Sequence, residues 1–353
     1  MPENPAEISF VDAIRDGVAE EMREDPSVIV YGLGVNDPGR VFGTTAGLLE
    51  EFGPSRVFET PTAENAMTGI AVGGALGGLK PIVTHQRFDF FLLAMDQLVN
   101  SAAKWRYMFG GQFNVPIVIR LITGRGWGQG PTHSQSYHSW LTQVPGLKVV
   151  MPSSASDAKS LIKASIRDPN PVVFIENRWL HQLAATPEDQ PVSLEKGHSR
   201  IVRSGGSITI ATFGFGVAEA VRASVALEAE GVQCEIIDLM TLVPIDMGTV
   251  SASILKTGRI LIVDLAPATG SFARNLLTAI HQQLPDPSGT QMSVLAGHDM
   301  PEPTSHGAIA GFHIDAVAIF GRVGELMGLD LEPPTSLFRA LPDSPPSGNL
   351  GPF

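Results

Sequence analysis

Glu64 is the first residue whose type and position could support chemistry. It follows the turn at residues 60–63 and opens an expected helix at residues 64–79, built almost wholly from small and apolar residues. A carboxylate in that setting would be partly buried. Two interpretations stay open: a first-turn acid that complements the helix dipole, or a desolvated acid suited to proton exchange near neutral pH.

His133 is a second candidate, near the end of the glycine-rich segment GRGWGQGPTHSQS at residues 124–136. Four glycines allow a backbone shape or a close ligand approach that other residues could not reach. A loop histidine is often only a solvated or hydrogen-bonded surface group. Loops at the carboxyl ends of parallel strands, however, are where ligands bind.

Phe90 belongs to a third cluster, RFDFF at residues 87–91, which directly follows an expected strand. Three phenylalanines in four residues favour core filling. One of these rings could instead stack on a planar heterocycle.

Alternating strands and helices must position these three clusters. Short β-branched runs predict strands in the first half of the chain at residues 27–31, 56–59, 81–85, 115–121, 147–151 and 171–175. Helical patterns separate most of them, notably at residues 64–79, 92–108 and 157–167. Continuous apolar strands alternating with helices predict an α/β fold whose parallel sheet is covered on both faces.

The length of 353 residues indicates two packed α/β domains. We expect the first at residues 1–190, a linker at 191–205 and the second at 206–330. The second domain should contain strands at residues 207–212, 234–237, 259–264 and 291–295, with helices at 217–230 and 272–283. The proline-rich residues 331–353 are expected to form a mobile or docked tail.

Composition narrows the function class. The formal net charge of -12 and pI of about 5.2 argue against nucleic acid or anionic lipid as partners. The single cysteine, Cys234, excludes an internal disulfide. The N-terminus resembles neither a signal nor a transit peptide, and no apolar run is long enough to span a bilayer. These features predict a cytoplasmic protein.

Several collinear segments together resemble a known family, the beta subunit of the 2-oxo acid dehydrogenase first component (pyruvate, branched-chain and acetoin types), related to transketolase. The segments are ETPTAENAMTGIAVGGALGGLKPI, FDFFLLAMDQLVNSAAKWRYMFGGQFNVPIVIR, GPTHSQS, PGLKVVMPSSASDAK and IRDPNPVVFIEN. The resemblance covers roughly residues 8–325. It implies a transketolase-like pyrimidine-binding domain followed by a transketolase C-terminal domain.

The resemblance also implies roles for individual residues in binding thiamine diphosphate. Glu64 matches the glutamate that hydrogen-bonds the aminopyrimidine ring and stabilises its imino tautomer. Phe90 matches the ring that packs on the aminopyrimidine, and Leu33 and Gln86 fall at further cofactor-binding positions. His133 matches the histidine implicated in handling the acyl intermediate and its transfer to lipoamide.

Metal ions and partners follow from the same resemblance. A structural monovalent cation, K⁺, is expected at Ile117, Ser165, Asp168 and Asn170. The family's Mg²⁺ and diphosphate are held by an alpha-type subunit through a Gly-Asp-Gly motif, which is absent from this sequence. The chain is therefore expected to hold half a cofactor site and to work in an α2β2 heterotetramer, with a lipoyl acyltransferase core as a further partner.

The sequence departs from the family pattern at several positions. Gly32, Leu33 and Gly34 stand where many members have an acidic pair, and Thr84 stands where a glutamate is usual. His85 and Arg87 are unusual polar residues here, and they either recognise a substrate carboxylate or pair with acids at a subunit interface. Further departures lie in the second domain, which in the family helps to bind the acyltransferase core: Met240, Leu265 and residues 300–312.

Three functions are compatible with these patterns. The first is oxidative decarboxylation of a 2-oxo acid with acyl transfer to lipoamide. The second is a transketolase-like carboligase that uses an aldehyde or ketone acceptor. The third is an inactive scaffold subunit, against which the presence of Glu64, Phe90 and His133 argues.

Overall fold

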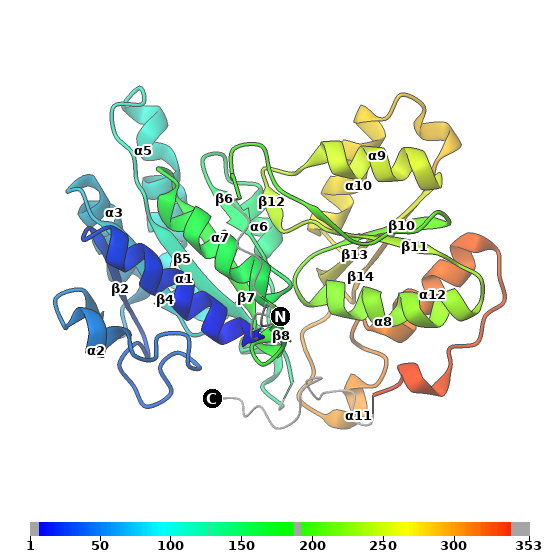
Figure 1. Cartoon of the computed structure of the whole chain (residues 1–353), viewed down its shortest axis with the longest axis horizontal. Helices are drawn as coiled ribbons and strands as arrows, with labels where there is room; N and C mark the ends of the chain where they lie inside the picture. The colour runs from blue at the N-terminus through cyan, green and yellow to red at the C-terminus, as the bar shows by residue number, and fades with distance from the viewer. Residues whose placement is uncertain (1–6, 127, 187–191, 340–353) are drawn as a thin grey trace, which may run out of the picture.

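The first domain is built on a seven-stranded sheet in the order β12-β6-β7-β5-β4-β2-β3 (Figure 1). The computed structural model describes residues 7–126, 128–186 and 192–339. All neighbouring strands of this sheet are parallel except β12, which is antiparallel to β6. Its strands are β2 (Val28–Gly32), β3 (Val57–Glu59), β4 (Lys80–His85), β5 (Val118–Thr123), β6 (Lys148–Val150), β7 (Val172–Asn177) and β12 (Thr241–Val243).

Helices cover both faces of this sheet because alternate strand residues point to opposite sides. In β2, Val28 and Val30 pack with the side chains of α1 (Phe10–Glu24) and α7 (Ala155–Arg167), which lie side by side. Ile29 and Tyr31 face α3 and the helical segments that follow β4. On that side lie α3 (Glu64–Leu76), α4 (Phe88–Phe91), a 3₁₀ turn (Leu92–Ala94), a π-helical segment (Gln97–Ala102) and α5 (Ala103–Met108).

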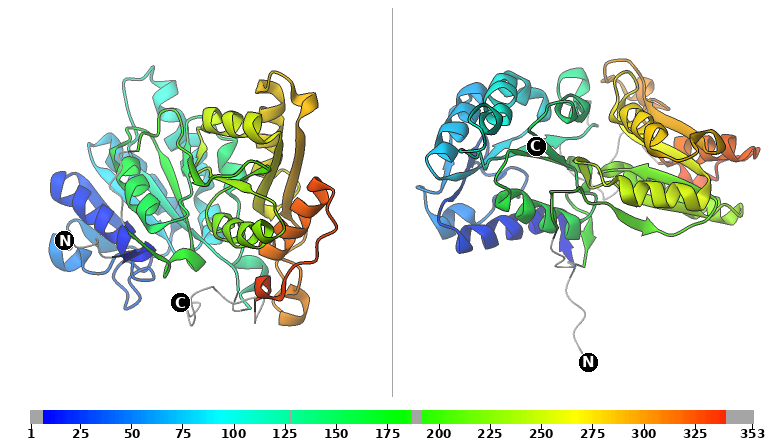
Figure 2. Two further views of the ribbon diagram at one scale, coloured as in Figure 1. Left: turned by 45° about the vertical axis from the view of Figure 1, so that its right-hand side comes forward. Right: turned by 90° about the horizontal axis from the view of Figure 1, so that it is seen from above.

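The second domain has a five-stranded sheet in the order β14-β13-β10-β11-β9, parallel except for β9 (Figure 2). Its strands are β9 (Arg200–Arg203), β10 (Ile208–Thr212), β11 (Cys234–Asp238), β13 (Arg259–Pro267) and β14 (Gln291–Gly297). One face packs on α8 (Phe215–Ala229) and α12 (Ala316–Met327). The other face packs on α9 (Met247–Thr257) and α10 (Phe272–Gln283).

Short elements complete the fold. β1 (Ile8–Ser9) pairs with β8 (Ala184–Ala185), so the start of the described chain lies beside the end of the first domain. The remaining short helices are α2 (Leu48–Phe52), α6 (His138–Thr142) and α11 (His306–Ile309).

The predicted α/β fold class with two parallel-sheet domains is confirmed. Three details differ from the expected elements. The expected helix at residues 92–108 is interrupted by its 3₁₀ and π-helical segments. β9 forms within the expected linker because it adds an antiparallel edge to β11. β12, which follows a strand of the second domain, joins the sheet of the first.

Three further sequence expectations concern a membrane span, Cys234 and the proline-rich tail. No helix in the described ranges is long and apolar enough to cross a membrane. Cys234 is buried in β11, and burial raises the pKa of its thiol to about 12. A thiol in that environment stays protonated and unreactive at neutral pH. Of the expected tail, residues 331–339 are described and include a 3₁₀ turn (Thr335–Leu337); residues 340–353 lie outside the described part.

Candidate functional site

The carboxyl ends of β2, β3, β4 and β5 bring the predicted site residues to one edge of the first sheet. The parallel register pairs Gly32 with Glu59 and with Thr84, and it pairs His85 with Leu121. The segments that follow these four strands therefore leave the sheet at the same level. They carry Leu33, Glu64, Gln86, Phe90 and His133. A ligand bound at this edge can contact segments that are far apart in the sequence.

Glu64 is the first residue of α3, and its side chain is buried, with 6% exposed. It makes no hydrogen bond or ion pair with any other residue in the described ranges. Glu59, only five positions earlier, accepts hydrogen bonds from the backbone N–H groups of Gly34 (2.7 Å) and Asn36 (3.0 Å). Glu59 thus shapes the loop after β2, whereas the Glu64 carboxylate is available to a ligand.

The rings of Phe90 and His133 are in contact. Their centroids are 5.2 Å apart and the ring planes are nearly perpendicular, at 88°. Asp89 fixes this arrangement from the neighbouring position, because its Oδ1 accepts hydrogen bonds from the backbone N–H of Gln135 (3.2 Å) and from its side-chain amide (2.7 Å). The glycine-rich loop is therefore tied to α4, and both rings are half-buried.

Leu33 and Gln86 are also neighbours at this edge. The backbone N–H of Leu33 donates to the carbonyl of Thr84 at 3.2 Å. The next residue, Gly34, has φ +77°, and a Cβ there would overlap the Gln86 side-chain amide. The left-handed backbone angle favours glycine at this position.

His85 and Arg87 are more deeply placed than the rest of the cluster. Only 1% and 3% of their surfaces are exposed. Burial lowers the pKa of His85 to about 3, so its ring, which contacts Phe91 edge-on at 5.0 Å, is neutral. The Nη2 of Arg87 donates to the Oε1 of Gln129 at 2.5 Å. Neither residue lines the interdomain cavity described below.

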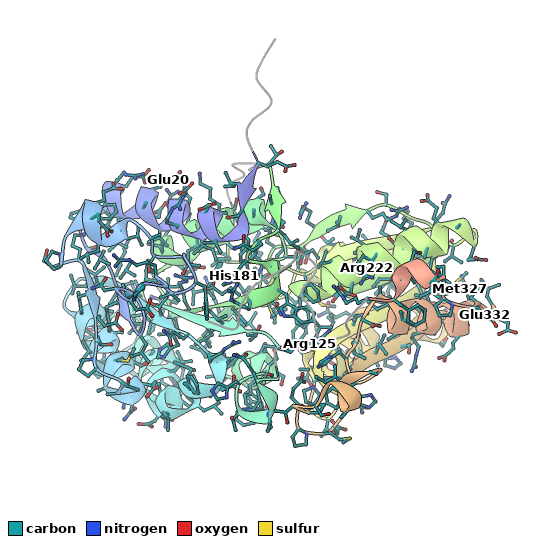
Figure 3. All side chains as sticks on the ribbon, turned by 90° about the horizontal axis from the view of Figure 1, so that it is seen from below. Glu20, Arg125, His181, Arg222, Met327 and Glu332 are labelled. Carbon is teal, nitrogen blue, oxygen red and sulfur yellow. The ribbon has the colours of Figure 1, made fainter. Side chains whose placement is uncertain are left out.

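A buried charged cluster beneath this edge was missed by the sequence reasoning. Arg120 in β5 donates from Nε and Nη2 to Glu176 Oε1 in β7, at 3.0 and 2.6 Å. The Nε2 of His181 lies 3.3 Å from Glu176 Oε2, and all three side chains are 0–1% exposed (Figure 3 labels His181). Charged residues inside the apolar runs VIRLIT and VVFIEN were the available signal.

The four residues expected to hold a monovalent cation lie where β5, α7 and β7 meet. Asp168 is paired with the Lys148 ammonium, and its Oδ1 accepts the Asn170 backbone N–H at 2.9 Å. The Ser165 hydroxyl donates to the Leu161 carbonyl at 2.6 Å, and the Ile117 carbonyl accepts the backbone N–H of Val172 at 3.0 Å. Several groups of this set thus already have protein partners.

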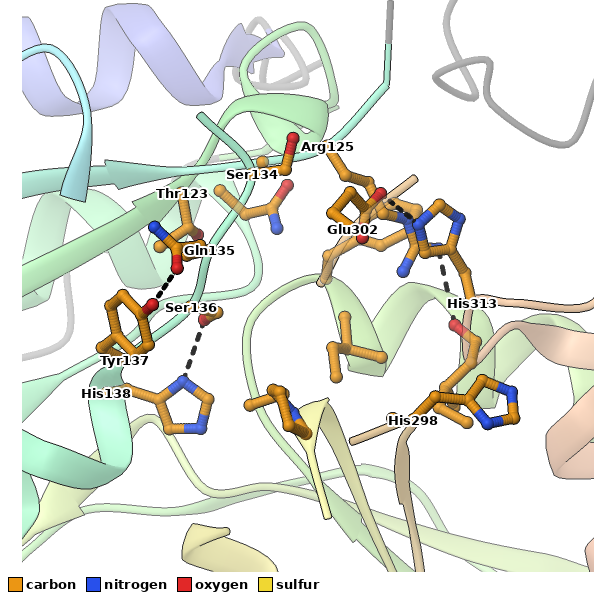
Figure 4. A pocket seen from close by; sticks show the side chains of 18 of the residues that line it. Thr123, Arg125, Ser134, Gln135, Ser136, Tyr137, His138, His298, Glu302 and His313 are labelled. Carbon is orange, nitrogen blue, oxygen red and sulfur yellow. Dashed lines mark hydrogen bonds and ion pairs between the residues drawn. The ribbon is translucent and has the colours of Figure 1, made fainter. Parts of the chain in front are cut away.

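A cavity of about 540 Å³ lies between the two domains (Figure 4). Its lining from the first domain includes the end of β5 and the loop up to His138. From the second domain it includes the end of β13 and the segments after β10 and β14. Arg125 lies between the two lobes (Figure 3). Inside the cavity, the ring of His138 links the domains, since its Nδ1 is 3.0 Å from Ser136 Oγ and its Nε2 is 3.1 Å from Asp264 Oδ1.

The residues at the sheet edge fit one end of thiamine diphosphate. A buried carboxylate without an internal partner suits hydrogen bonding to a ring nitrogen, and the half-buried Phe90 offers an aromatic face for stacking. The Mg²⁺-diphosphate end needs a set of oxygen ligands. No group of three or more His, Cys, Asp or Glu side chains that could hold a metal ion occurs among the described residues. The sheet-edge residues thus fit the pyrimidine end of the cofactor.

Comparison with known families matches two domains in the expected order. Residues 6–182 match the family described as "Transketolase, pyrimidine binding domain". Residues 197–319 match "Transketolase, C-terminal domain". Among solved structures, the chain resembles "Split gene transketolase, inactive beta4 tetramer", with a TM-score of 0.73 at 19% identity, over 92% of this chain and 100% of that chain. That likeness supports the fold alone.

Relatives with higher identity are described as beta subunits of the pyruvate dehydrogenase E1 component. "Pyruvate dehydrogenase E1 component subunit beta" of Rhizobium meliloti (strain 1021) is 43% identical over 299 residues, which are 84% of this chain and 65% of that protein. This chain therefore spans less than two thirds of that protein's length. The Rickettsia bellii (strain RML369-C) protein of the same description is 38% identical over 84% of this chain and 91% of its own length.

A plant relative matches a similar share of this chain. "Pyruvate dehydrogenase E1 component subunit beta-1, mitochondrial" of Arabidopsis thaliana is 40% identical over 301 residues, which are 84% of this chain and 83% of that protein. The identity runs across both domains and agrees with the domain matches. The chain belongs to the family of pyruvate dehydrogenase E1 beta subunits, with its transketolase-type pyrimidine-binding and C-terminal domains.

Proposed function

We propose that this chain is the pyrimidine-binding half of a thiamine diphosphate enzyme that decarboxylates a 2-oxo acid and passes the acyl group to lipoamide. The observation that carries the proposal is the Glu64 side chain, which is 6% exposed and has no partner among the described residues, at the strand edge where Phe90 and His133 meet. Membership of the E1 beta family supports the same cofactor and reaction class.

The chain's own residues would act by holding protons and orienting rings. When bound, the cofactor supplies the electron sink for decarboxylation, so the protein has to bind, orient and tune it. Glu64 would keep a proton on the ring nitrogen that it faces. Phe90 would support the ring's plane, with Leu33 and Gln86 beside it. His133, held by its contact with Phe90, would stabilise or move a proton at the transferred acyl group.

The proposal requires a partner that completes the site. The described residues offer no metal-binding cluster for a Mg²⁺-diphosphate. Exposed apolar side chains lie on three neighbouring elements: α3, the 3₁₀ turn at Leu92–Ala94, and α5. They are Ile70 (62% exposed), Leu93 (69%), Tyr107 (89%) and Met108 (56%). Such exposure is typical of surfaces that other proteins cover. We propose an alpha-type subunit in an α2β2 assembly, active only together, and a lipoyl acyltransferase core as a further partner.

The monovalent cation at Ile117, Ser165, Asp168 and Asn170 would have to bind beside Lys148, which already neutralises Asp168. Equal melting temperatures of the protein in potassium chloride and in choline chloride would show that no potassium ion binds at this site. We propose that His85 and Arg87 lie beside the substrate carboxylate. Both side chains are buried, so the substrate would approach them from the side where Arg87 contacts Gln129.

Co-expression with native partners tests the proposal directly. The purified complex should reduce a dye electron acceptor with one or more 2-oxo acids when thiamine diphosphate and Mg²⁺ are present. Mass spectrometry should identify an alpha-type chain. A complex that only joins 2-oxo acids to aldehydes or ketones would show the carboligase instead, and a complex inactive in both assays would show a scaffold subunit.

A further inference from the structure

The interdomain cavity is not used by the proposed cofactor site, since Glu64, Phe90 and His133 do not line it. Its walls come from the carboxyl ends of strands in both sheets, β5 and β7 on one side and β10, β13 and β14 on the other. Such strand ends are usual positions for ligands in α/β folds. A volume of about 540 Å³ lies within the range of small-molecule sites.

Two buried donors at the cavity have no hydrogen-bond partner in the described part of the chain: Arg125 Nε and Ser134 Oγ. The Nη2 of Arg125 reaches only the Ile314 carbonyl, at a long 3.5 Å. Leaving a buried polar group unsatisfied is costly, and more so for a charged one. Both side chains lie at the same end of the cavity (Figure 4).

The acids near Arg125 are engaged elsewhere. Glu302 is paired with His313, and Glu219 with Arg222 and Arg339. Burial lowers the pKa of Arg125 to about 10, while these acids oppose the shift, so the guanidinium remains charged at neutral pH. Arg125 is the single Lys or Arg among the lining residues, which also include Asp299 and Glu302. One cation among two acids favours a monoanion over a phosphate dianion.

The rest of the cavity is largely apolar. Side chains of Met151, Trp179, Phe213, Phe215 and Phe312 line it. The Arg125 guanidinium lies 5.0 Å from the centroid of the Trp179 ring, which holds the cation at the edge of this apolar wall. A ligand that matches this lining has an apolar body and one negatively charged end.

We propose that the cavity binds a small organic monocarboxylate with an apolar side chain, its carboxylate held by Arg125 and Ser134 and its body packed between the two domains. The inference goes beyond the proposed function and does not depend on it. Because Ser134 follows His133 directly, an occupant would also restrain the loop that carries the Phe90–His133 contact.

Titration calorimetry on the full chain tests the site with phenylacetate as the probe. We expect saturable binding, about tenfold weaker for the uncharged phenylacetamide and for Arg125→Gln, because a charge-assisted hydrogen bond is lost. Ser134→Ala, which removes only a hydroxyl, should weaken binding about threefold to tenfold. Arg322→Gln is the matched control, since Arg322 does not line the cavity and pairs with the exposed Glu325, and should bind as the unmodified chain does.

Circular dichroism and thermal melting check that each variant folds. If Arg125→Gln does not fold, the binding measured for Ser134→Ala decides whether the proposal holds. Hydrogen exchange should show ligand protection in residues 131–138 and 297–302. No saturable binding up to about 10 mM phenylacetate would overturn the proposal. So would equal binding by Ser134→Ala, or inorganic phosphate binding as tightly as the carboxylate.

Discussion

At the scale of single residues, burial decides which side chains are available for chemistry. Glu59 ends β3 and Glu64 opens α3 five residues later. Glu59 accepts hydrogen bonds from two backbone N–H groups, whereas Glu64 has no partner within the described ranges. His85 and His133 differ in the same way, since the first is sealed in the core as a neutral ring and the second meets Phe90 at the loop surface.

Glu64→Gln should slow exchange of the cofactor's carbon-bound thiazolium proton with deuterated water by at least about 100-fold in the assembled complex. Glutamine keeps the shape and loses the acid, and positioned acid–base groups are worth about 10² to 10⁴ in rate. Quenched-flow exchange followed by NMR at full cofactor occupancy measures it. Glu50→Gln, on an exposed side chain, is the control. Exchange within a few-fold of the unmodified complex would leave Glu64 as a helix-opening acid.

Arg87→Ala should raise KM for the 2-oxo acid more than it lowers kcat, because loss of binding shared by ground and transition states acts on KM. Steady-state kinetics of the assembled complex check this. The residue is buried and bonded to Gln129, so a structural role predicts a different result: reduced thermal stability with KM unchanged for every substrate accepted.

His85 should make the protein less stable in mild acid. Its folded pKa of about 3 lies below the ordinary histidine value, so as pH falls below about 6.5 the unfolded chain gains a proton that the folded chain does not. Stability therefore falls with pH, by up to about 1.4 kcal/mol per pH unit for one such group. In urea titrations at pH 7 and 5.5, His85→Leu should lose less stability than the unmodified chain. An equal loss in both would contradict the assignment.

At the scale of elements, the parallel sheet does most of the positioning. Loops after β2, β3, β4 and β5 meet because their strands are parallel and in register. Between β5 and β7, the buried Arg120–Glu176 pair and His181 lie beneath that edge. Removing one partner of a buried ion pair is strongly destabilising, because the other charge stays buried without compensation.

Glu176→Gln should lower the free energy of unfolding by about 3–5 kcal/mol, because Arg120 would remain buried without a compensating charge. Urea denaturation measures the loss. Glu51→Gln, which breaks the exposed Arg23–Glu51 pair, should cost much less stability, because solvent screens exposed ion pairs. Replacing both partners, with Arg120→Met and Glu176→Leu, should recover much of the loss. A Glu176→Gln loss no larger than the Glu51→Gln loss would contradict the view that the pair is fully desolvated.

At the scale of the whole molecule, the two domains share a core. One continuous apolar cluster joins Leu121 and Leu147 of the first domain to Phe213 and Leu239 of the second. β12 adds to the first sheet through β6, and the backbone N–H of Met151 donates to the Met240 carbonyl at 2.8 Å. The second domain therefore packs directly against β6 of the first sheet and the residue that follows it.

The isolated chain should bind thiamine diphosphate far more weakly than the co-expressed complex, because its described residues provide the pyrimidine end of a site and no metal cluster for the diphosphate. Calorimetry with Mg²⁺ present compares the two preparations. Binding by the isolated chain with a Kd near about 1 μM would show that one chain holds the whole cofactor.

The sequence by itself determined the fold class and the identity of the edge residues. Continuous apolar strands alternating with helices can pack only as covered parallel sheets, and the segments around Glu64, Phe90 and His133 follow those strands directly. It could not show that Glu59 holds the loop after β2, because the backbone N–H groups of Gly34 and Asn36 that donate to it lie 25 and 23 positions earlier in the chain.

Only the tertiary structure decided the rest. The Arg120–Glu176–His181 cluster, the pairing of β12 with β6 and the cavity around Arg125 each join residues that are tens of positions or more apart. No local periodicity encodes such contacts. They depend on which strand ends the packed domains bring together, and on which polar groups that packing leaves without water.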